Sequence, residues 1–473
     1  MKAIADAGIP VKSVSEVTGF PEMMDGRVKT LHPMIHGGIL AIRDNPDHVK
    51  AMKEHGITGI DLVAVNLYPF RETIAKPDVT RAEAIENIDI GGPSMVRAAA
   101  KNYKYVTIVV DPSQYSDILE RIKSDTLTEE FRLDLSRKAF LHTGLYDCAI
   151  ADYMTKEVNG SKDTLPDIYS KAYVKVQDLR YGENPHQAAK FYGKFDNMFD
   201  QLHGKEISYN NLLDIDSAVN LIDEFDELTF AILKHNNACG IASRGNVVDA
   251  WKDALAGDPV SAFGGILITN TTVNKEVAEE INKIFFEVII APAYDADALE
   301  VLKQKKNRII LVRKECKTCP MQFRSLLNGV LMQEKDLSIQ GEADLEPMTE
   351  KKPTAPEVED LLFANKIVKN SKSNAITLVK NKQLCASGIG QTSRVDSLKQ
   401  AIEKAVSFNF DLNGAVMASD AFFPFADCVE IADKAGITAV IQPGGSINDK
   451  LSVDYCNEHG LAMVKTGIRH FKH

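Results

Sequence analysis

The first third of the chain alternates short apolar runs with segments of helical periodicity. Apolar residues dominate 61–65 and 105–110, which is typical of strands covered on both faces in a parallel sheet. Helical patterns occupy 81–86 and 93–101. The pattern predicts an α/β layer domain here. By contrast, residues 1–10 indicate the last turn of a helix capped by Gly8, and no strand precedes it.

The rest of the chain alternates in the same way and predicts a second α/β region. Strands are expected at 228–233, 265–268, 288–290, 309–312, 375–379 and 438–441. The polar segment 157–163 is rich in helix breakers and is the predicted linker. We therefore predict two domains, 1–160 and 161–473. The acidic stretch 342–357, which contains prolines, is expected to be an exposed connection.

Composition and charge narrow the class of protein. The chain has 473 residues, a formal net charge of −11 and 26% charged residues, which argues against nonspecific nucleic-acid binding. No apolar run approaches the ~18 residues of a membrane span, and no signal-peptide pattern opens the chain. Because no signal peptide is expected, the seven cysteines are predicted to be reduced thiols in the cytoplasm. Cys316 and Cys319 form half of a zinc site without a second half, so no metal is expected.

The segment 234–240 carries the most informative chemistry. Lys234 and His235 follow a predicted buried strand, and two asparagines and Gly240 complete the segment. This places a base, a cation and hydrogen-bonding groups on one tight turn, as proton transfer on a small polar substrate requires. The alternative is a strand end with a solvated Lys-His pair, because histidine is also common on loops.

Two segments of the first domain suit a phosphorylated ligand. Arg27 and Lys29 stand two apart, and in extended backbone both would project to one side. Gly91 and Gly92 precede a helix that begins near Pro93, so a helix N-terminus would face whatever the glycines contact. A solvated basic loop and an ordinary glycine turn are the alternatives.

Further loops have a composition suited to binding a planar, phosphorylated molecule. Each also has an ordinary interpretation as a surface turn. They are 66–70, which follows a strand, and 180–187, 258–265, 371–374, 388–394 and 419–425.

Taken in order, these motifs resemble one known family. It joins formyltransferase for 5-aminoimidazole-4-carboxamide ribonucleotide (AICAR) to inosine monophosphate (IMP) cyclohydrolase. The resemblance covers essentially the whole chain, up to the terminal residues 469–473. It implies an N-terminal methylglyoxal-synthase-like domain and a C-terminal transformylase of two cytidine-deaminase-like subdomains. It also implies a homodimer with transformylase sites at the subunit interface, and no catalytic metal.

The resemblance assigns formyl transfer to the second domain. The formyl group of the co-substrate 10-formyltetrahydrofolate passes to the 5-amino group of AICAR, a poor nucleophile that needs a base. By resemblance His235 is that base, Lys234 is the neighbouring cation, and Asn374 donates to the developing oxyanion or holds the formyl group. The implied nucleotide-binding residues are Arg180, Tyr181, Gly264, Glu287, Arg394, Phe422 and Arg469, and the implied folate-binding residues are Asp427 and Ser446.

The second implied step is ring closure of formyl-AICAR to IMP in the first domain. The carboxamide nitrogen attacks the formyl carbon and water leaves, so the site must orient one molecule and shuttle protons. Lys101 is the expected proton donor or acceptor. The other matching positions are Lys29, Tyr68 and Asp89 for catalysis, and Arg27 and Asn66 for substrate binding.

The chain departs from the family pattern in places. The family's first domain normally begins roughly 35 residues earlier, and without that strand and phosphate loop a sheet edge and phosphate donors would be missing. Ala238 stands where proline is frequent, and Ala426 where arginine is usual. The main alternative is therefore a transformylase that has lost cyclohydrolase activity. A nonenzymatic nucleotide- or folate-binding regulator and a zinc-dependent deaminase are less favoured alternatives.

Overall fold

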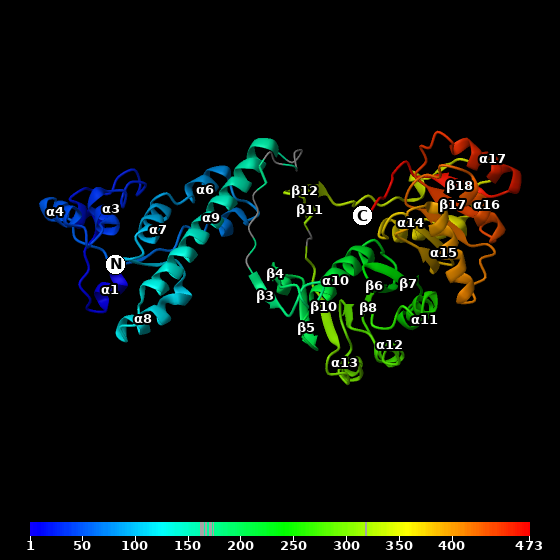
Figure 1. Ribbon diagram of the computed structural model, residues 1–473, viewed down its shortest axis with the longest axis horizontal. Helices are drawn as coiled ribbons and strands as arrows, with labels where there is room; N and C mark the ends of the chain where they lie inside the picture. Colours follow the sequence, from blue (N-terminus) through cyan, green and yellow to red (C-terminus); the bar gives the residue numbers. More distant parts are fainter. Residues whose placement is uncertain (161–164, 166–167, 170–172, 174, 317–318) are drawn as a thin grey trace. The chain divides into compact units, whose positions relative to one another are not determined.

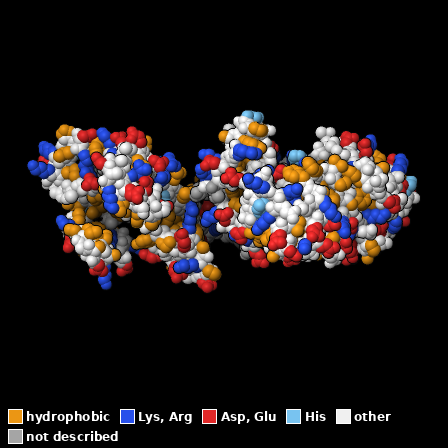
Figure 2. All heavy atoms as spheres, turned by 90° about the horizontal axis from the view of Figure 1, so that it is seen from below, with side chains coloured by type: hydrophobic (Ala, Val, Ile, Leu, Met, Phe, Trp, Pro, Cys, Tyr) orange, Lys and Arg blue, Asp and Glu red, His pale blue; other side chains and the backbone are white. Residues whose placement is uncertain are grey.

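The computed structural model describes residues 1–473 except 161–164, 166, 167, 170–172, 174, 317 and 318. The chain divides into two compact units, Met1–Ala172 and Tyr173–His473, here called unit 1 and unit 2 (Figure 1). Among the described residues, no helix is long and apolar enough to cross a membrane. The sequence has an excess of acidic residues. Basic and acidic side chains are interspersed on the face drawn in Figure 2.

Unit 1 is built on a parallel pair of strands. Strand β1 (Leu62–Ala64) lies beside β2 (Thr107–Val109), and both fall within the runs predicted from the sequence. The helices are α1 (Lys2–Asp6), α2 (Val14–Thr18), α3 (Pro33–Leu40), α4 (Pro46–Glu54), α5 (Phe70–Ile74), α6 (Arg81–Glu86), α7 (Gly91–Lys101), α8 (Tyr115–Lys123) and α9 (Glu129–Asn159). Helix α1 ends before Gly8, whose φ is +74°, as the predicted cap requires.

The core of unit 1 lies between α7, α9 and strand β2. Val96 and Ile108 are fully buried there, and Leu135 of α9 packs against them in the same cluster. All three residues of β2 are buried, whereas Leu62 of β1 is 39% exposed. Strand β1 pairs with β2 alone among the described residues, which leaves its other edge open.

Unit 2 contains one sheet of twelve strands. Its spatial order is β13-β18-β17-β16-β14-β15-β7-β6-β8-β9-β10-β5. The strands are β5 (Phe199–His203), β6 (Thr229–Lys234), β7 (Asn237–Ser243), β8 (Ile266–Thr269), β9 (Val288–Ala291), β10 (Ile309–Arg313), β13 (Glu346–Pro347), β14 (Ile376–Lys380), β15 (Gln383–Gly388), β16 (Val416–Ser419), β17 (Ala439–Gln442) and β18 (Ala462–Lys465). All six strands predicted in this region are confirmed to within a residue or two.

The sheet consists of two halves with the same strand arrangement. In one half β6 pairs antiparallel with β7 and β8, and β9 and β10 continue in parallel. In the other half β14 pairs antiparallel with β15 and β16, and β17 and β18 continue in parallel. The halves meet where Gln383 of β15 pairs with Ala242 of β7. Two structural repeats thus share a single sheet.

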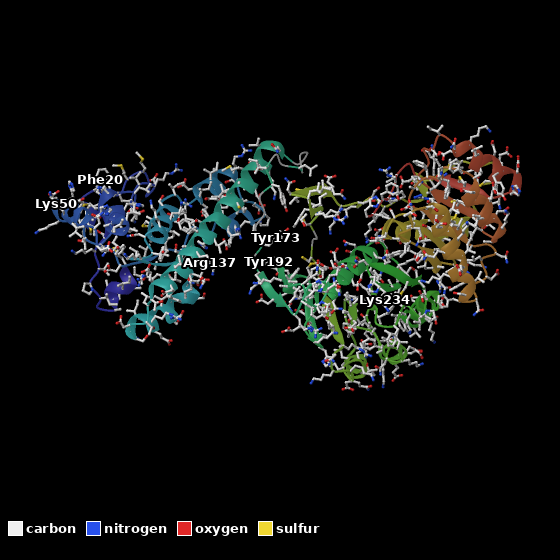
Figure 3. All side chains as sticks on the ribbon, viewed as in Figure 1. Phe20, Lys50, Arg137, Tyr173, Tyr192 and Lys234 are labelled. Carbon is white, nitrogen blue, oxygen red and sulfur yellow. The ribbon has the colours of Figure 1, made fainter. Side chains whose placement is uncertain are left out.

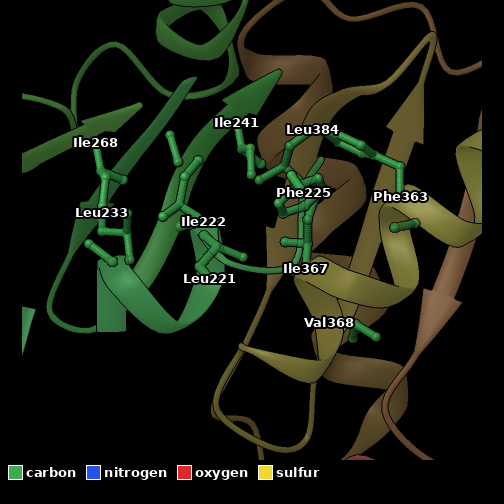
Figure 4. Packing of buried hydrophobic residues seen from close by; sticks show 14 of the residues in the cluster. Leu221, Ile222, Phe225, Leu233, Ile241, Ile268, Phe363, Ile367, Val368 and Leu384 are labelled. Carbon is green, nitrogen blue, oxygen red and sulfur yellow. The ribbon is translucent and has the colours of Figure 1, made fainter. Parts of the chain in front are cut away.

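Helices cover both faces of this sheet. They are α10 (Tyr209–Ile222), α11 (Val247–Gly257), α12 (Lys275–Ile281), α13 (Ala296–Leu302), α14 (Ala355–Lys369), α15 (Arg394–Ser407), α16 (Asp427–Lys434) and α17 (Asp449–His459). Helices α10 and α14 share one core that crosses the boundary between the halves, with the Phe225 and Phe363 ring centroids 5.1 Å apart (Figure 4). On the opposite face each half has its own core, which in the first half includes Trp251. Burial on both faces explains the continuous apolar runs of the strands.

Two hairpins outside the main sheet and one connecting segment complete the description. Two hairpins are present, β3 (Lys175–Leu179) with β4 (Ala189–Tyr192), and β11 (Met321–Leu326) with β12 (Gly329–Glu334). The segment 342–357 is mostly exposed, as expected, but it also contributes strand β13 to the sheet. The predicted linker start at Glu157 is wrong, because α9 continues through Asn159. The remainder of that linker, the domain boundary after residue 160 and the centre of the CxxC segment lie outside the described residues.

Candidate active sites

The turn between β6 and β7 presents the predicted base. Its two central residues, His235 and Asn236, have φ values of +51° and +66°, the left-handed backbone of a tight two-residue hairpin turn. The backbone N–H of Asn236 donates to Asp214 Oδ1 at 2.6 Å, which fixes the turn on α10, and burial raises the pKa of that carboxyl. The His235 side chain is exposed. Ala238 lies beyond the turn, in β7 opposite Leu233.

Two loops are attached to this turn by hydrogen bonds. The ammonium of Lys234, labelled in Figure 3, donates to the carbonyl oxygen of Phe263 at 2.6 Å. The side chain of Asn237 accepts from the backbone N–H of Lys372 at 3.1 Å. The second contact joins the turn to the segment that carries Asn374. The structure therefore brings the three predicted transformylase residues into one region, although they are far apart in the sequence.

Asn374 is held by a buried network. Both terminal nitrogens of Arg394 donate to Asn374 Oδ1 at 3.1 Å, and Arg394 Nη2 also donates to Asp420 Oδ1 at 2.6 Å. The side chain of Arg394 is 8% exposed and that of Asp420 is fully buried. Asn374 Nδ2 donates to the backbone carbonyls of Gln391 and Thr392. Donation to a substrate oxyanion by Asn374 therefore requires one of these hydrogen bonds to be exchanged.

A cavity of about 260 Å³ lies behind the turn. Its lining residues are Lys234, His235, Asn237, Ala238, Cys239, Ser261, Ser387, Ile389, Gln400 and Lys404. Lys404 forms an ion pair with Asp258, which is 1% exposed. Burial opposes the ionisation of Asp258, but hydrogen bonds from Lys404 and Ser261 outweigh it and lower the pKa of the carboxyl. Burial raises the pKa of the Cys239 thiol to about 12, so this cysteine is a weak nucleophile.

The sequence did not identify this ion pair. Asp258 lies within the loop 258–265 that was singled out, but nothing in that loop marks the aspartate as a partner of Lys404. Lys404 stands on α15 without any motif. Only folding brings the two residues together.

The other predicted nucleotide-site residues are distributed over unit 2. Gly264 follows the carbonyl that binds Lys234, and the backbone N–H of Glu287 donates to Gly265 at 3.0 Å. The carboxylate of Glu287 accepts from Lys205 at 2.5 Å. Both positions therefore lie near the β6–β7 turn.

Arg180 and Tyr181 lie on the loop between β3 and β4. The guanidinium stands over the Tyr181 ring, 4.7 Å from its centroid. Among the described residues, no hydrogen bond connects either side chain to His235 or Asn374. The structure thus places both residues on one loop of unit 2, where their side chains contact each other.

Strands β16, β17 and β18 of the second half of the sheet are followed by two predicted nucleotide-site residues, Phe422 and Arg469, and by the two predicted folate-binding residues, Asp427 and Ser446. Phe422 is 38% exposed, and Asp427 is the first residue of α16. The loop after Phe422 contacts the loop that carries Ser446, since Asn448 Nδ2 donates to the carbonyl of Pro424 at 3.0 Å. Arg469 is exposed, with its guanidinium 4.4 Å from the centroid of the Phe471 ring.

Unit 1 has an open cleft of about 660 Å³ along α7. It is lined by Leu31, His32, Pro33, His36, Leu40, Ser94, Arg97, Ala98, Lys101 and Phe140. Arg97 and Lys101 share this face, one helical turn apart, and the Arg97 guanidinium stands 5.5 Å from the centroid of the Phe140 ring. The cleft therefore offers two cations and two histidines to an anionic ligand.

Asp89 lies at the other end of α7. It accepts hydrogen bonds from the backbone N–H groups of Gly92 at 2.7 Å and Tyr68 at 3.3 Å, so it caps the helix. A Cβ on Gly92 would lie 2.4 Å from an Asp89 oxygen, which explains the glycine. The eleven residues of the helix separate Asp89 from Lys101 by ~15 Å of backbone. Asn66 and Tyr68 are exposed after β1.

The expected extended conformation around Arg27 is wrong. Met23 and Val28 pair across a turn that contains Arg27, because Gly26 allows a φ of +87°. Arg27 forms an ion pair with Glu86, and Lys29 one with Glu22 at 2.8 Å. All four side chains are about half exposed, so these are weak surface pairs that an anionic substrate can displace.

Across the described part of the chain, no group of three or more His, Cys, Asp or Glu side chains is arranged to hold a metal ion. The expectation that catalysis needs no metal stays a prediction. Cys148, Cys239, Cys385, Cys428 and Cys456 are free thiols.

Comparison with known proteins agrees with this architecture. Residues 99–404 match the family described as AICARFT/IMPCHase bienzyme, and residues 1–94 match the MGS-like domain. The chain is 62% identical over 472 residues to bifunctional purine biosynthesis protein PurH of Bacteroides thetaiotaomicron, over 99% of this chain and 92% of that protein. Proteins of the same name in Acetivibrio thermocellus and Thermoanaerobacter sp. are 50% and 52% identical, over 100% and 98% of this chain and 93% and 92% of their own lengths.

The fold and the matches define a bifunctional α/β enzyme with an MGS-like domain and a large second domain. The chain belongs to the AICARFT/IMPCHase bienzyme family. Its activities are those of an AICAR formyltransferase and an IMP cyclohydrolase, the last two steps of IMP biosynthesis. The predicted family, fold class and enzyme function are confirmed.

Proposed function

We propose that formyl transfer takes place at the β6–β7 turn, with His235 as the base. The amino nitrogen of AICAR attacks the formyl carbon of 10-formyltetrahydrofolate, the bond from that carbon to N10 breaks, and His235 takes the amino proton. The same proton can then pass to N10 of the departing tetrahydrofolate. The exposed His235 ring at the tip of a fixed turn suits this shuttle.

Lys234 and Asn374 complete the proposed transformylase centre. Lys234 lies beside the base, and its ammonium is held by the Phe263 carbonyl, so it supplies a fixed positive charge near the leaving amine. Asn374 holds the formyl oxygen as negative charge develops, after exchange of one hydrogen bond to the backbone. The nucleotide is bound by Arg180, Tyr181, Gly264, Glu287, Arg394, Phe422 and Arg469, and the folate by Asp427 and Ser446.

Ring closure is proposed for unit 1, with residues 1–160 as the cyclohydrolase domain and 161–473 as the transformylase domain. Lys101 transfers a proton as the carboxamide nitrogen attacks the formyl carbon and water leaves. It lines the open cleft together with Arg97, which can bind an anionic group. Lys29, Tyr68 and Asp89 assist, and Arg27 and Asn66 hold the substrate. Release of Arg27 and Lys29 from their carboxylate partners would accompany binding.

We further propose that the enzyme is a cytoplasmic homodimer. The β11–β12 hairpin supports a partner surface, because nearly all of its residues are exposed although several are apolar. Leu327 is 100% exposed, Leu331 61% and Val330 50%. A hairpin that leaves such residues in water is marginally stable alone, and a second copy of the chain would bury them. Light scattering of the wild type and of Leu331→Asp tests this: a monomeric wild type would contradict it.

The single observation that carries the proposal is the fixed β6–β7 turn, which bears Lys234 and His235 and is joined through Asn237 to the segment of Asn374. The test mixes AICAR with 10-formyltetrahydrofolate and follows tetrahydrofolate and IMP by chromatography. Both products above the spontaneous cyclisation blank are expected. Tetrahydrofolate with only formyl-AICAR would support the transformylase-only alternative, and neither product would favour a binding protein.

A further inference from the structure

The last four residues of the chain are tied to both sides of the Asn374 network. The backbone N–H of His470 donates to the carbonyl of Asp420 at 3.0 Å, and Asp420 in turn binds Arg394. Lys472 exchanges two hydrogen bonds with Ser373, one from its N–H to Ser373 Oγ at 3.0 Å and one to its carbonyl from Ser373 N–H at 2.9 Å. We call residues 470–473 the C-terminal strap.

The strap is anchored by buried side chains. His470 is 2% exposed; its Nδ1 lies 2.6 Å from Asp336 Oδ2, and its Nε2 lies 3.0 Å from Gln340 Oε1. The Lys472 ammonium donates to the carbonyl of Asn370 at 2.9 Å. Along the strap, His470 is buried and Lys472 is partly buried, whereas Phe471 and His473 are exposed; this alternation is that of an extended strand, so the side chains of His470 and Lys472 point inward. Asp336 and Gln340 lie on a segment that carries none of the proposed catalytic residues, whereas Asn370 ends α14 just before the segment of Asn374.

The hydrogen-bond partners define the protonation state of His470. Asp336 offers a carboxylate, which can only accept. Gln340 Oε1 also accepts from Asn365 at 2.8 Å, while Gln340 Nε2 donates to Ser338 at 2.8 Å. Both ring nitrogens therefore face acceptors, so both must carry a proton and the ring is an imidazolium.

Other charges surround the same network. Glu224 of the segment after α10 pairs with Lys369 of α14 at 3.2 Å, and Lys472 of the strap lies nearby at Asn370. Burial opposes the ionisation of Asp336, but the hydrogen bond and charge of His470, the charge of Lys369 and a backbone hydrogen bond from Ser338 together outweigh it and lower the pKa of the carboxyl. An ionised Asp336 matches a cationic His470.

We propose that His470 is a positioning residue for formyl transfer: as an imidazolium between Asp336 and Gln340, it fixes the strap that orients Asn374. This inference rests on the proposed function of Asn374. Without the proton on one of its ring nitrogens, His470 loses one of the two hydrogen bonds that anchor the strap. The strap then contacts Ser373 and Asp420 less firmly, and Asn374 loses its fixed geometry. Misplacement by ~1 Å is enough to reduce a rate strongly.

The test compares His470→Ala, Asn374→Ala and the double variant in steady-state formyl transfer. The expected result is a decrease in kcat of roughly 10- to 100-fold for His470→Ala. In the double variant, kcat should be almost the same as in Asn374→Ala alone, because His470 affects the reaction only through Asn374. The matched control is His473→Asn, an exposed histidine three residues along the same strap, which should retain kcat.

The split between kcat and KM distinguishes positioning from general destabilisation. In His470→Ala and in Asp336→Asn, kcat should fall while the KM for 10-formyltetrahydrofolate stays near the wild-type value, because both changes remove an anchor of the strap and leave the proposed folate-binding residues in place. The fluorescence of Trp251, the only tryptophan and 1% exposed in unit 2, verifies that each variant is folded.

The outcomes separate the two hypotheses. Unchanged kcat in Asn374→Ala would overturn the proposed function of Asn374, and the inference with it. A loss in Asn374→Ala with no loss in folded His470→Ala would overturn the strap alone. Additive losses in the double variant, or a wild-type kcat in folded Asp336→Asn, would also overturn it.

Discussion

The two units hold their candidate catalytic groups in different ways. In unit 2, Asn374 is held by Arg394, which is buried against the fully buried Asp420, and Lys234 is bound to a backbone carbonyl. In unit 1, the cations Arg27 and Lys29 are about half exposed and pair with exposed carboxylates. Formyl transfer brings two substrates together, which costs translational and rotational entropy. Protein groups that are already oriented reduce this cost. Ring closure acts within one molecule, and its candidate groups can rearrange when the substrate displaces their partners.

The largest effect should come from removing the proposed base of unit 2. His235→Ala should lower kcat for formyl transfer by about 10² to 10⁴-fold, because no other group at the turn can take the amino proton. Cyclohydrolase activity on formyl-AICAR supplied alone should be unchanged. His459→Ala, an exposed histidine on α17, is the control. Equal losses in formyl transfer and ring closure would contradict the assignment of one activity to each unit.

A comparable test applies to unit 1. Lys101→Ala should lower IMP formation from formyl-AICAR by about 10²-fold while formyl transfer continues, because the proton donor of the cleft is lost. Lys104→Ala is a matched control, since this lysine is three residues further on and pairs with Asp44 at 2.9 Å. Full cyclohydrolase activity in Lys101→Ala would show that ring closure does not use this cleft.

The third prediction concerns the buried ion pair of unit 2. Lys404→Met should lower the free energy of unfolding by about 3 kcal/mol near neutral pH, because Asp258 would remain buried without its cation. The pKa of Asp258 is lowered in the folded state, so the stabilisation is complete above the ordinary carboxyl pKa and is lost as pH falls through the folded value. The difference from wild type should therefore shrink below pH ~4.

Urea unfolding followed by Trp251 emission measures this difference, since the tryptophan lies on α11 in the same unit. Lys399→Met on the exposed side of α15 serves as the control. A difference that persists undiminished at acid pH would mean that packing of the lysine stem, not its charge, stabilises the site.

The smallest effect is expected at the surface of unit 1. Glu86→Gln should change the free energy of unfolding by less than about 1 kcal/mol, because its pair with Arg27 is exposed. It should lower the KM for formyl-AICAR by roughly 2- to 5-fold, since Arg27 no longer has to leave a carboxylate. Glu54→Gln, in the exposed pair with Lys50, is the control. A higher KM would mean that Glu86 orients Arg27 for binding.

The sequence by itself determined the elements that depend on local physics. The six strands predicted in unit 2 were readable because burial on both faces requires continuous apolar runs. Helix α6 matches its predicted bounds, and α7 begins two residues early because the Asp89 carboxylate caps its free N–H groups. A tight turn was predicted for 234–240, and the structure confines it to His235 and Asn236, because β7 begins at Asn237. The ordered motifs were enough to identify the family.

Only the tertiary structure decided which distant groups meet. Local pattern placed Arg27 and Lys29 in extended backbone, but a turn and two ion pairs hold them instead. The pair of Lys404 with Asp258 and the contacts of His470 with Asp336 and Gln340 have no sequence signal, because they join segments more than a hundred residues apart. Periodicity reports the surface that an element buries, whereas the identity of its partners depends on how the sheet is assembled.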